Sequence, residues 1–177
     1  VIRSIVISAG GTGGHISPGV AIAEILTEKK EKFGLQSVYI HSISRNLNNP
    51  DLQNPPCNVI WHDSPRWTKW NFLIFPFLFL KNLFLTFIKF HKLQVDAVIS
   101  MGGYSSIPSL IYSFVFRKKI FLCEQNCVMG KVNRIFSRFA KKIALSFPVV
   151  GIDKIKTEWK VLGNPLRKKI TPNISVK

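Results

Sequence analysis

A run of glycines between an apolar stretch and a helical pattern constrains the fold of this chain most. Residues 2–8 are apolar and typical of a strand, and residues 9–15 read Ala-Gly-Gly-Thr-Gly-Gly-His. A helical pattern then begins at Pro18, and Gly34 stands where a helix C-cap belongs. Glycines let backbone N–H groups approach a ligand closely, and a helix N-terminus behind them favours a phosphate or diphosphate. The sequence therefore predicts an anion-binding loop after the first strand.

Strand and helix patterns alternate along the rest of the chain. Expected strands are 38–43, 58–61, 97–100, 120–123 and 143–147, and further expected helices are 107–116 and 131–140. This alternation predicts an α/β fold whose parallel sheet is covered on both faces. The periodicity weakens beyond Pro148, so residues 149–177 are expected to form a linker that leaves a domain of residues 1–148.

Composition narrows the class of partner. The chain has 177 residues with 25 Lys and Arg against 9 Asp and Glu, a net charge of +16, and 46% hydrophobic residues, which excludes disorder. So large a basic excess indicates an anionic partner: nucleic acid, a phospholipid surface or a phosphorylated substrate. The three cysteines show no disulfide or zinc spacing, and no secretory signal opens the chain. We therefore expect free thiols, no bound metal and the cytoplasm.

Two further strand ends carry similar features. Residues 100–106 read Ser-Met-Gly-Gly-Tyr-Ser-Ser, and another strand ends in Cys123-Glu124-Gln125-Asn126. In a parallel sheet these strand ends and the first glycine loop meet at one carboxyl edge, where ligands bind. Ile16 breaks the dinucleotide-binding fingerprint, and the first loop lacks the Lys-Ser/Thr pair of a Walker loop.

Four segments, 10–15, 102–105, 124–126 and 163–167 (Gly-Asn-Pro-Leu-Arg), resemble the successive motifs of the MurG family. The resemblance covers nearly the whole chain. It implies the Rossmann-like, acceptor-side amino-terminal domain of a GT-B glycosyltransferase, whose second domain carries most of the sugar-nucleotide pocket. We expect that second domain to be absent from this chain, and we therefore expect little activity from the chain alone. One departure is Cys123, where the family usually has His.

The resemblance also implies a function and a set of site residues. The family are inverting transferases of peptidoglycan synthesis, which move N-acetylglucosamine (GlcNAc) from UDP-GlcNAc to lipid I and form lipid II without a cofactor. His15 is the candidate general base or diphosphate ligand, and Glu124 is either a competing base or a structural hydrogen-bond acceptor. Thr12, Gly13, Gly14, Asn126 and Arg167 match positions that contact UDP-GlcNAc, and Gly102, Gly103, Tyr104 and Ser105 match the loop thought to face the acceptor diphosphate.

The segment from residue 66 to residue 92 is rich in Phe, Leu and Trp, and its charged residues are all basic. An all-round apolar helix is either buried or in contact with lipid. Pro76, Lys81 and Asn82 interrupt this segment, so a spanning helix is not expected. We expect it to bind an anionic membrane surface, peripherally and on the cytoplasmic face. The expected contacts are Trp67, Trp70, Phe75, Phe79, Lys81, Lys89 and Lys92.

Two other classes of function stay open from the sequence. A non-catalytic membrane-bound module would share the apolar segment and lack turnover. A basic nucleic-acid-binding domain would share the charge, but the aromatic residues cluster with Leu and Ile instead of interleaving with Arg, and we find no nucleic-acid motif. We therefore expect no nucleic-acid partner.

Overall fold

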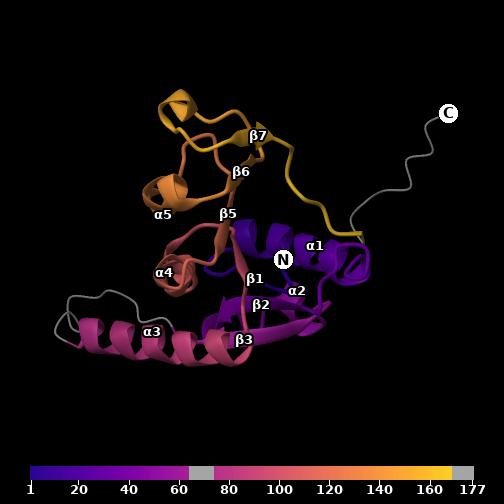
Figure 1. Ribbon diagram of the computed structural model, residues 1–177, viewed down its shortest axis with the longest axis vertical. Coiled ribbons are helices and arrows are strands. Elements are labelled where there is room, and N and C mark those ends of the chain that lie inside the picture. The colour runs from indigo at the N-terminus through magenta and orange to yellow at the C-terminus, as the bar shows by residue number, and fades with distance from the viewer. Residues whose placement is uncertain (64–73, 169–177) are drawn as a thin grey trace.

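The structure is a computed structural model that describes residues 1–63 and 74–168. Within them, parallel strands form one seven-stranded sheet in the order β3-β2-β1-β4-β5-β6-β7 (Figure 1). The strands are β1 (Ser4–Ser8), β2 (Ser37–Ile43), β3 (Asn58–His62), β4 (Ala97–Ser100), β5 (Lys119–Glu124), β6 (Lys142–Leu145) and β7 (Trp159–Val161). The parallel α/β architecture predicted from the sequence is confirmed.

Helices cover both faces of this sheet. They are α1 (Gly13–Glu28), α2 (Pro50–Gln53), α3 (Phe75–Lys92), α4 (Ile107–Val115) and α5 (Lys131–Phe136), with short 3₁₀ turns η1 (Ser44–Asn46), η2 (Tyr104–Ser106), η3 (Ser137–Phe139) and η4 (Ile152–Lys154). In Figure 1, α3, α4 and α5 lie to the left of the sheet, and α1 lies to its right.

Side chains of β1 alternate between hydrophobic clusters on the two faces of the sheet. Ile7 packs with Ile16 of α1 on one face of the sheet. Val6, the preceding residue, packs on the other face with Phe90 of α3 and Tyr112 of α4. All five side chains are at most 1% exposed. Because successive strand residues point to opposite faces, one short apolar strand supports both helical layers.

Helix α1 begins at Gly13, five residues before the predicted start at Pro18. Glycine disfavours helix, so the sequence pattern hides the first turn, and proline is tolerated near a helix start. Further along, a β-carbon at Gly19 would lie 2.5 Å from the Cβ of Ala9. The absence of a side chain at Gly19 therefore lets α1 approach the end of β1 and fixes the first glycine loop in place.

The sheet extends into the segment that the sequence suggests as a linker. β7 pairs with β6, with Ile143 opposite Trp159, and Trp159 packs against the hydrophobic cluster that holds Ile143. A strand of three residues between polar segments carries too few positions for a periodic signal, so the sequence did not show it. Residues 159–161 form the last strand of the domain.

Candidate functional site

The first and second glycine loops interlock at the carboxyl edge of the sheet. A β-carbon at Gly10 would lie 3.0 Å from Ser105 Oγ, so the two loops are in contact. Gly11, Gly102 and Gly103 all have positive φ (95°, 89° and 75°), a conformation that glycine adopts without strain. Ser105 is 2% exposed, and its Oγ finds no hydrogen-bond partner among the described residues. The loops meet because β1 and β4 are neighbours in the sheet.

His15 stands at this junction. Its ring lies beside Gly103, where a β-carbon would be 3.6 Å from His15 Cε1, and its Nδ1 is 3.2 Å from Thr12 Oγ1. Burial lowers the pKa of His15, and the negative charge of Glu124 partly opposes this effect. The imidazole is therefore neutral at pH 7. When Nδ1–H donates to Thr12 Oγ1, Nε2 carries the lone pair that a proton acceptor needs.

Glu124 is buried and its carboxylate is fully engaged. Oε1 accepts hydrogen bonds from the backbone N–H and the side-chain amide of Asn126, at 3.1 and 2.9 Å. Oε2 accepts from the N–H of Gly130 and from Asn133 Nδ2, both at 2.9 Å. The side chain is 2% exposed. This geometry favours the structural role for Glu124, which orders the loop that carries Asn126.

Asn133 of α5 links this third loop to the second glycine loop. Its Nδ2 also donates to the carbonyl oxygen of Cys123 at 3.0 Å, and a β-carbon at Gly102 would lie 3.0 Å from the same nitrogen. The Cys123 thiol is buried, which raises its pKa to about 12, so it stays protonated. The three strand ends are thus connected through Ser105 and Asn133.

Tyr104 and Arg45 form the outer part of the site. Tyr104 is 44% exposed, and its hydroxyl accepts a hydrogen bond from Nη2 of Arg45, an exposed residue just after β2. The contact brings a fourth strand end to the same edge. Beside Tyr104 lies a cavity of about 270 Å³, whose lining includes Phe75, Phe79 and Ile107.

Arg167 lies apart from the loops. Its guanidinium donates to Glu24 Oε1 at 2.9 and 2.8 Å and to Asp51 Oδ1 at 2.5 Å, and the residue is 7% exposed. Glu24 is ten residues beyond Gly14 along α1, a distance of about 15 Å. The structure therefore places Arg167 in an ion-pair cluster that fastens the end of the described chain to α1 and α2, not at the glycine loops.

The structure places most of the expected membrane contacts on α3. Of its expected membrane contacts, Trp67 and Trp70 fall outside the described residues. Phe75 and Phe79 are half-buried and stack with ring centroids 6.3 Å apart. Lys81 and Lys92 are exposed, and Lys89 Nζ donates to the carbonyl oxygen of Trp61 at 3.0 Å. In the part of the chain that the structure describes, no helix has the length and apolarity to cross a membrane.

Three residues of this site were missed in the sequence. Arg45 follows β2 with no glycine motif around it, and Asn133 resembles any polar residue of a short helix. Gln125 belongs to the Glu-Gln-Asn motif, but nothing in the sequence indicated a role for it. In the structure both of its side-chain polar atoms are buried without a partner among the described residues. A buried amide without partners is available to a ligand. Its signal lies in the three-dimensional structure alone.

Comparisons with known proteins show what this chain is similar to. Residues 5–145 match the model described as the glycosyltransferase family 28 N-terminal domain. A Leptospira interrogans protein named UDP-N-acetylglucosamine--N-acetylmuramyl-(pentapeptide) pyrophosphoryl-undecaprenol N-acetylglucosamine transferase is 54% identical over 99% of this chain and 49% of its own length. A Fusobacterium nucleatum protein of the same name is 33% identical over 96% of this chain and 46% of its own length. The chain spans about half the length of the curated relatives it matches.

Solved structures show the same fold. The crystal structure of Acinetobacter baumannii MurG aligns with a TM-score of 0.73 at 27% identity, over 94% of this chain and 47% of that one. The calicheamicin glycosyltransferase CalG4 aligns with a TM-score of 0.61 at 7% identity, over 93% of this chain and 52% of that one, which supports the fold alone. The resemblance seen in the motifs is confirmed. Because the family model matches most of its length, this chain belongs to the glycosyltransferase family 28 N-terminal domain family.

Proposed function

We propose that this chain is the amino-terminal, acceptor-side half of an inverting glycosyltransferase of peptidoglycan synthesis, which transfers GlcNAc from UDP-GlcNAc to lipid I and forms lipid II. The observation that carries the proposal is the junction of the two glycine loops at His15. The names of the Leptospira and Fusobacterium relatives, which specify a pyrophosphoryl acceptor, support it.

The loops suit a diphosphate. Gly13 and Gly14 open α1, so their N–H groups and the positive end of the helix face the junction. Open space surrounds the Cα of Gly13, since a β-carbon there would meet nothing within 4 Å. Ser105 Oγ adds a buried polar group with no other partner among the described residues. We assign the acceptor diphosphate to the second loop and contacts with UDP-GlcNAc to Thr12, Gly13, Gly14 and Asn126.

His15 supplies the proton acceptor. In the proposed step the acceptor hydroxyl forms a bond to C1 of GlcNAc, the bond from C1 to the UDP oxygen breaks, and the hydroxyl proton moves to His15 Nε2. A neutral imidazole with Nδ1 held by Thr12 is ready for this transfer at pH 7. The negative charge of Glu124 then stabilises the imidazolium that forms, without contact between Glu124 and the substrate.

A chimaera with the full-length Leptospira interrogans relative tests the proposal. The matching half of the Leptospira interrogans relative is replaced by residues 1–168, which the 54% identity makes feasible, and transfer from labelled UDP-GlcNAc to a lipid I analogue is measured. We expect the chimaera to form the lipid II analogue and the 177-residue chain alone to form little. A folded chimaera without turnover would contradict the proposal.

We also propose that the outer face of the α3–α4–α5 layer binds an anionic membrane, peripherally and at the cytoplasmic side. The buried side of α3 is partly polar: Asn82 and Thr86 are buried along with Phe90, and their side chains donate to carbonyl oxygens of their own helix at 2.8 Å. Its solvent side carries Phe77, Leu80 and Phe84, which are 73%, 59% and 65% exposed. A helix with its apolar side outward needs an apolar partner.

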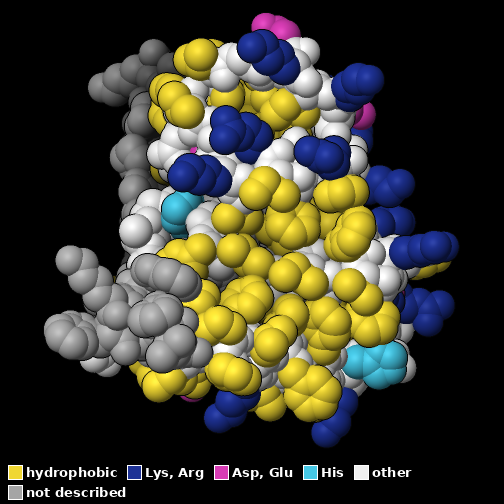
Figure 2. All heavy atoms as spheres, turned by 90° about the vertical axis from the view of Figure 1, so that its left-hand side faces the viewer, with side chains coloured by type: hydrophobic (Ala, Val, Ile, Leu, Met, Phe, Trp, Pro, Cys, Tyr) yellow, Lys and Arg dark blue, Asp and Glu magenta, His cyan; other side chains and the backbone are white. Residues whose placement is uncertain are grey.

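The apolar surface continues beyond α3. Phe87 contacts Phe116 with ring centroids 5.5 Å apart, and Phe114 contacts Phe139 of η3 at 4.6 Å. Figure 2 shows the result, a continuous apolar area with Lys and Arg side chains above it and at its lower rim. Above it, a cavity of about 890 Å³ has Arg134, Arg138, Lys154 and Lys156 in its lining. Apolar residues bordered by cations suit the headgroup boundary of an anionic bilayer.

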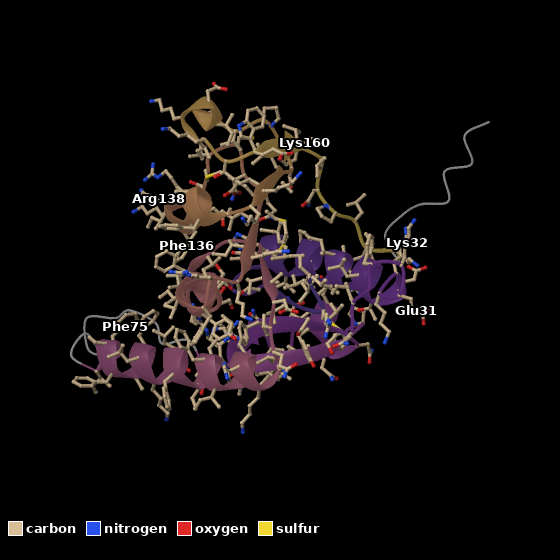
Figure 3. All side chains as sticks on the ribbon, in the orientation of Figure 1. Glu31, Lys32, Phe75, Phe136, Arg138 and Lys160 are labelled. Atoms are coloured by element: carbon tan, nitrogen blue, oxygen red, sulfur yellow. The ribbon has the colours of Figure 1, made fainter. Side chains whose placement is uncertain are left out.

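A pair of matched charge reversals tests this docking. Arg138 points away from α5 on the side that carries Phe75, whereas Lys32 lies on the opposite side of the molecule (Figure 3). We expect Arg138→Glu to reduce flotation with phosphatidylglycerol vesicles, and Lys32→Glu, the same change in net charge, to leave it unchanged. Phe84→Ser should remove the part of the binding that salt does not weaken. Equal binding by both charge variants would contradict an oriented membrane face.

A further inference from the structure

We propose that the cavity beside Tyr104 binds the first isoprenoid units of the acceptor's polyprenyl chain, and that Arg45 and Tyr104 hold the diphosphate to which they are joined. The inference rests on the proposed function and names the place where lipid and diphosphate meet. The membrane face described above is a separate surface on the outer side of α3, and the cavity lies between α3, the second glycine loop and the start of α4.

The cavity is apolar and narrow. Its volume is about 270 Å³, and its lining comprises Phe75, Phe79, Tyr104, Ile107 and Pro108 together with the polar residues His62, Asp63 and Asn82. The Phe75 and Phe79 rings are nearly parallel, with an interplanar angle of 12°. His62 also lines the space, and burial lowers its pKa to about 4, so it is uncharged at neutral pH. A space lined mainly by aromatic and aliphatic side chains accepts a thin hydrocarbon, and the carboxylate of Asp63 in the same lining disfavours an anion inside it.

The polar end of the cavity is Tyr104. Its ring lines the cavity, while its hydroxyl accepts a hydrogen bond from Arg45 Nη2. Among the described residues, the ion pairs do not include Arg45. A guanidinium that projects at the rim of a diphosphate site is suited to bind phosphate oxygens. Cation and apolar cavity therefore lie side by side, separated by one phenol ring.

The order of these groups matches the order of groups in the acceptor. His15 lies against Gly103, and the next residue, Tyr104, begins the cavity. The first turn of α3 forms the far wall with Phe75. Exposed Ile74, just before the helix, and exposed Phe77 of the membrane face flank Phe75 in the sequence. The relatives' name joins a muramyl group, a pyrophosphoryl group and undecaprenol in that sequence. Proton acceptor, diphosphate loops, cavity and membrane face follow the same sequence along the molecule.

Binding to the 177-residue chain tests the assignment without turnover or vesicles. Calorimetry compares inorganic diphosphate with geranyl diphosphate, which carries the same anion on two isoprene units. We expect geranyl diphosphate to bind at least about tenfold more tightly, because even one buried isoprene unit contributes that much. Arg45→Gln should weaken both ligands by a similar factor.

Variants on α3 give a matched pair. Phe79→Ser, inside the cavity, should abolish the preference for the prenyl ligand, and Phe77→Ser, exposed on the same helix, should retain it. Ile107→Trp, which fills the cavity from α4, should also abolish the preference. It replaces Phe79→Ser in the test if circular dichroism shows that Phe79→Ser folds poorly. Equal affinity of the wild-type chain for both ligands would overturn the isoprenoid site and leave the proposed function standing. Failure to bind either ligand would overturn both.

Discussion

The second glycine loop closes on α5 where Gly102 faces Asn133: a β-carbon at residue 102 would lie 3.0 Å from Asn133 Nδ2. That nitrogen also donates to Glu124 Oε2, so the loop and the third strand end share one partner. The conformation of the second loop therefore depends on the absence of a side chain at this residue.

Gly102→Ala should cost more stability than Gly34→Ala. Both glycines have positive φ, 89° and 64°, so each alanine incurs about 1 kcal/mol of backbone strain. Space is open around Gly34, whereas a methyl group at residue 102 would also press on Asn133. We expect Gly102→Ala to lower the free energy of unfolding by about 1 kcal/mol more than Gly34→Ala in urea titrations. Equal losses would show that the contact with Asn133 is slack.

Glu124→Ala should damage folding more than it damages any proton-transfer step. The substitution removes the acceptor of the backbone N–H groups of Asn126 and Gly130, and it leaves Asn133 Nδ2 with the carbonyl oxygen of Cys123 alone. We expect a loss of about 3 kcal/mol or more in the free energy of unfolding, because bonds to a buried carboxylate are strong. Glu124→Gln keeps the shape of the side chain and should recover part of the lost stability. If Glu124→Ala unfolds like the wild type, the carboxylate is free for catalysis.

The domain should lose stability on mild acidification because of two stacked histidines. His41 and His62 lie with ring centroids 4.1 Å apart, and burial lowers the pKa of His41 well below its usual value and that of His62 to about 4. In the unfolded chain both imidazoles take up protons near pH 6.5, whereas in the folded chain they stay neutral until a lower pH. Stability therefore falls as pH drops from 6.5 to 4, by about 3 kcal/mol for His62 alone.

Unfolding midpoints at several pH values check this dependence. His62→Leu should flatten the slope between pH 6.5 and 4, since it removes one of the buried groups that resist protonation. His91→Gln, at an exposed residue of α3, should leave the slope as it is. A wild-type profile that is flat over this range would mean that the histidine pair protonates in the folded state.

Arg167 should stabilise the domain without any ligand. Arg167→Met removes the guanidinium that Glu24 and Asp51 share, and we expect it to cost about 2 kcal/mol of unfolding free energy. Lys168→Met, at a side chain that is 67% exposed, should leave the unfolding midpoint unchanged. The reverse order of effects would argue that Arg167 serves a ligand instead.

The sequence predicted those parts of the fold and site that local pattern determines. Apolar runs that end in Gly10 or Gly102 predicted parallel strands with loops at one edge, because strand period and glycine conformations are local properties. It also indicated that His15 lies at this edge. The interlocking of Gly10 with Ser105 depends on β1 and β4 being neighbours, which no local pattern states.

The remainder depends on long-range partners. Arg167 matched a sugar-nucleotide motif, but the pairing with Glu24 joins residues 143 apart in the chain. The sequence predicted that Phe79 contacts the membrane and did not distinguish it from Phe77; in the structure Phe79 lines the cavity and Phe77 is 73% exposed. An apolar helix gives no period from which to tell its two sides. Its buried polar residues, Asn82 and Thr86, were the available signal, since polar groups bonded to their own helix can face inward.

The central claim is that His15 takes the proton from the acceptor hydroxyl at the junction of the glycine loops. The most direct measurement is the turnover of the Leptospira chimaera carrying His15→Ala, with His91→Ala as the matched control. The account predicts a loss of about 10²–10⁴-fold in kcat for His15→Ala, with unfolding midpoint and diphosphate affinity little changed, and full turnover for His91→Ala. Turnover of His15→Ala within twofold of the parent chimaera would contradict it.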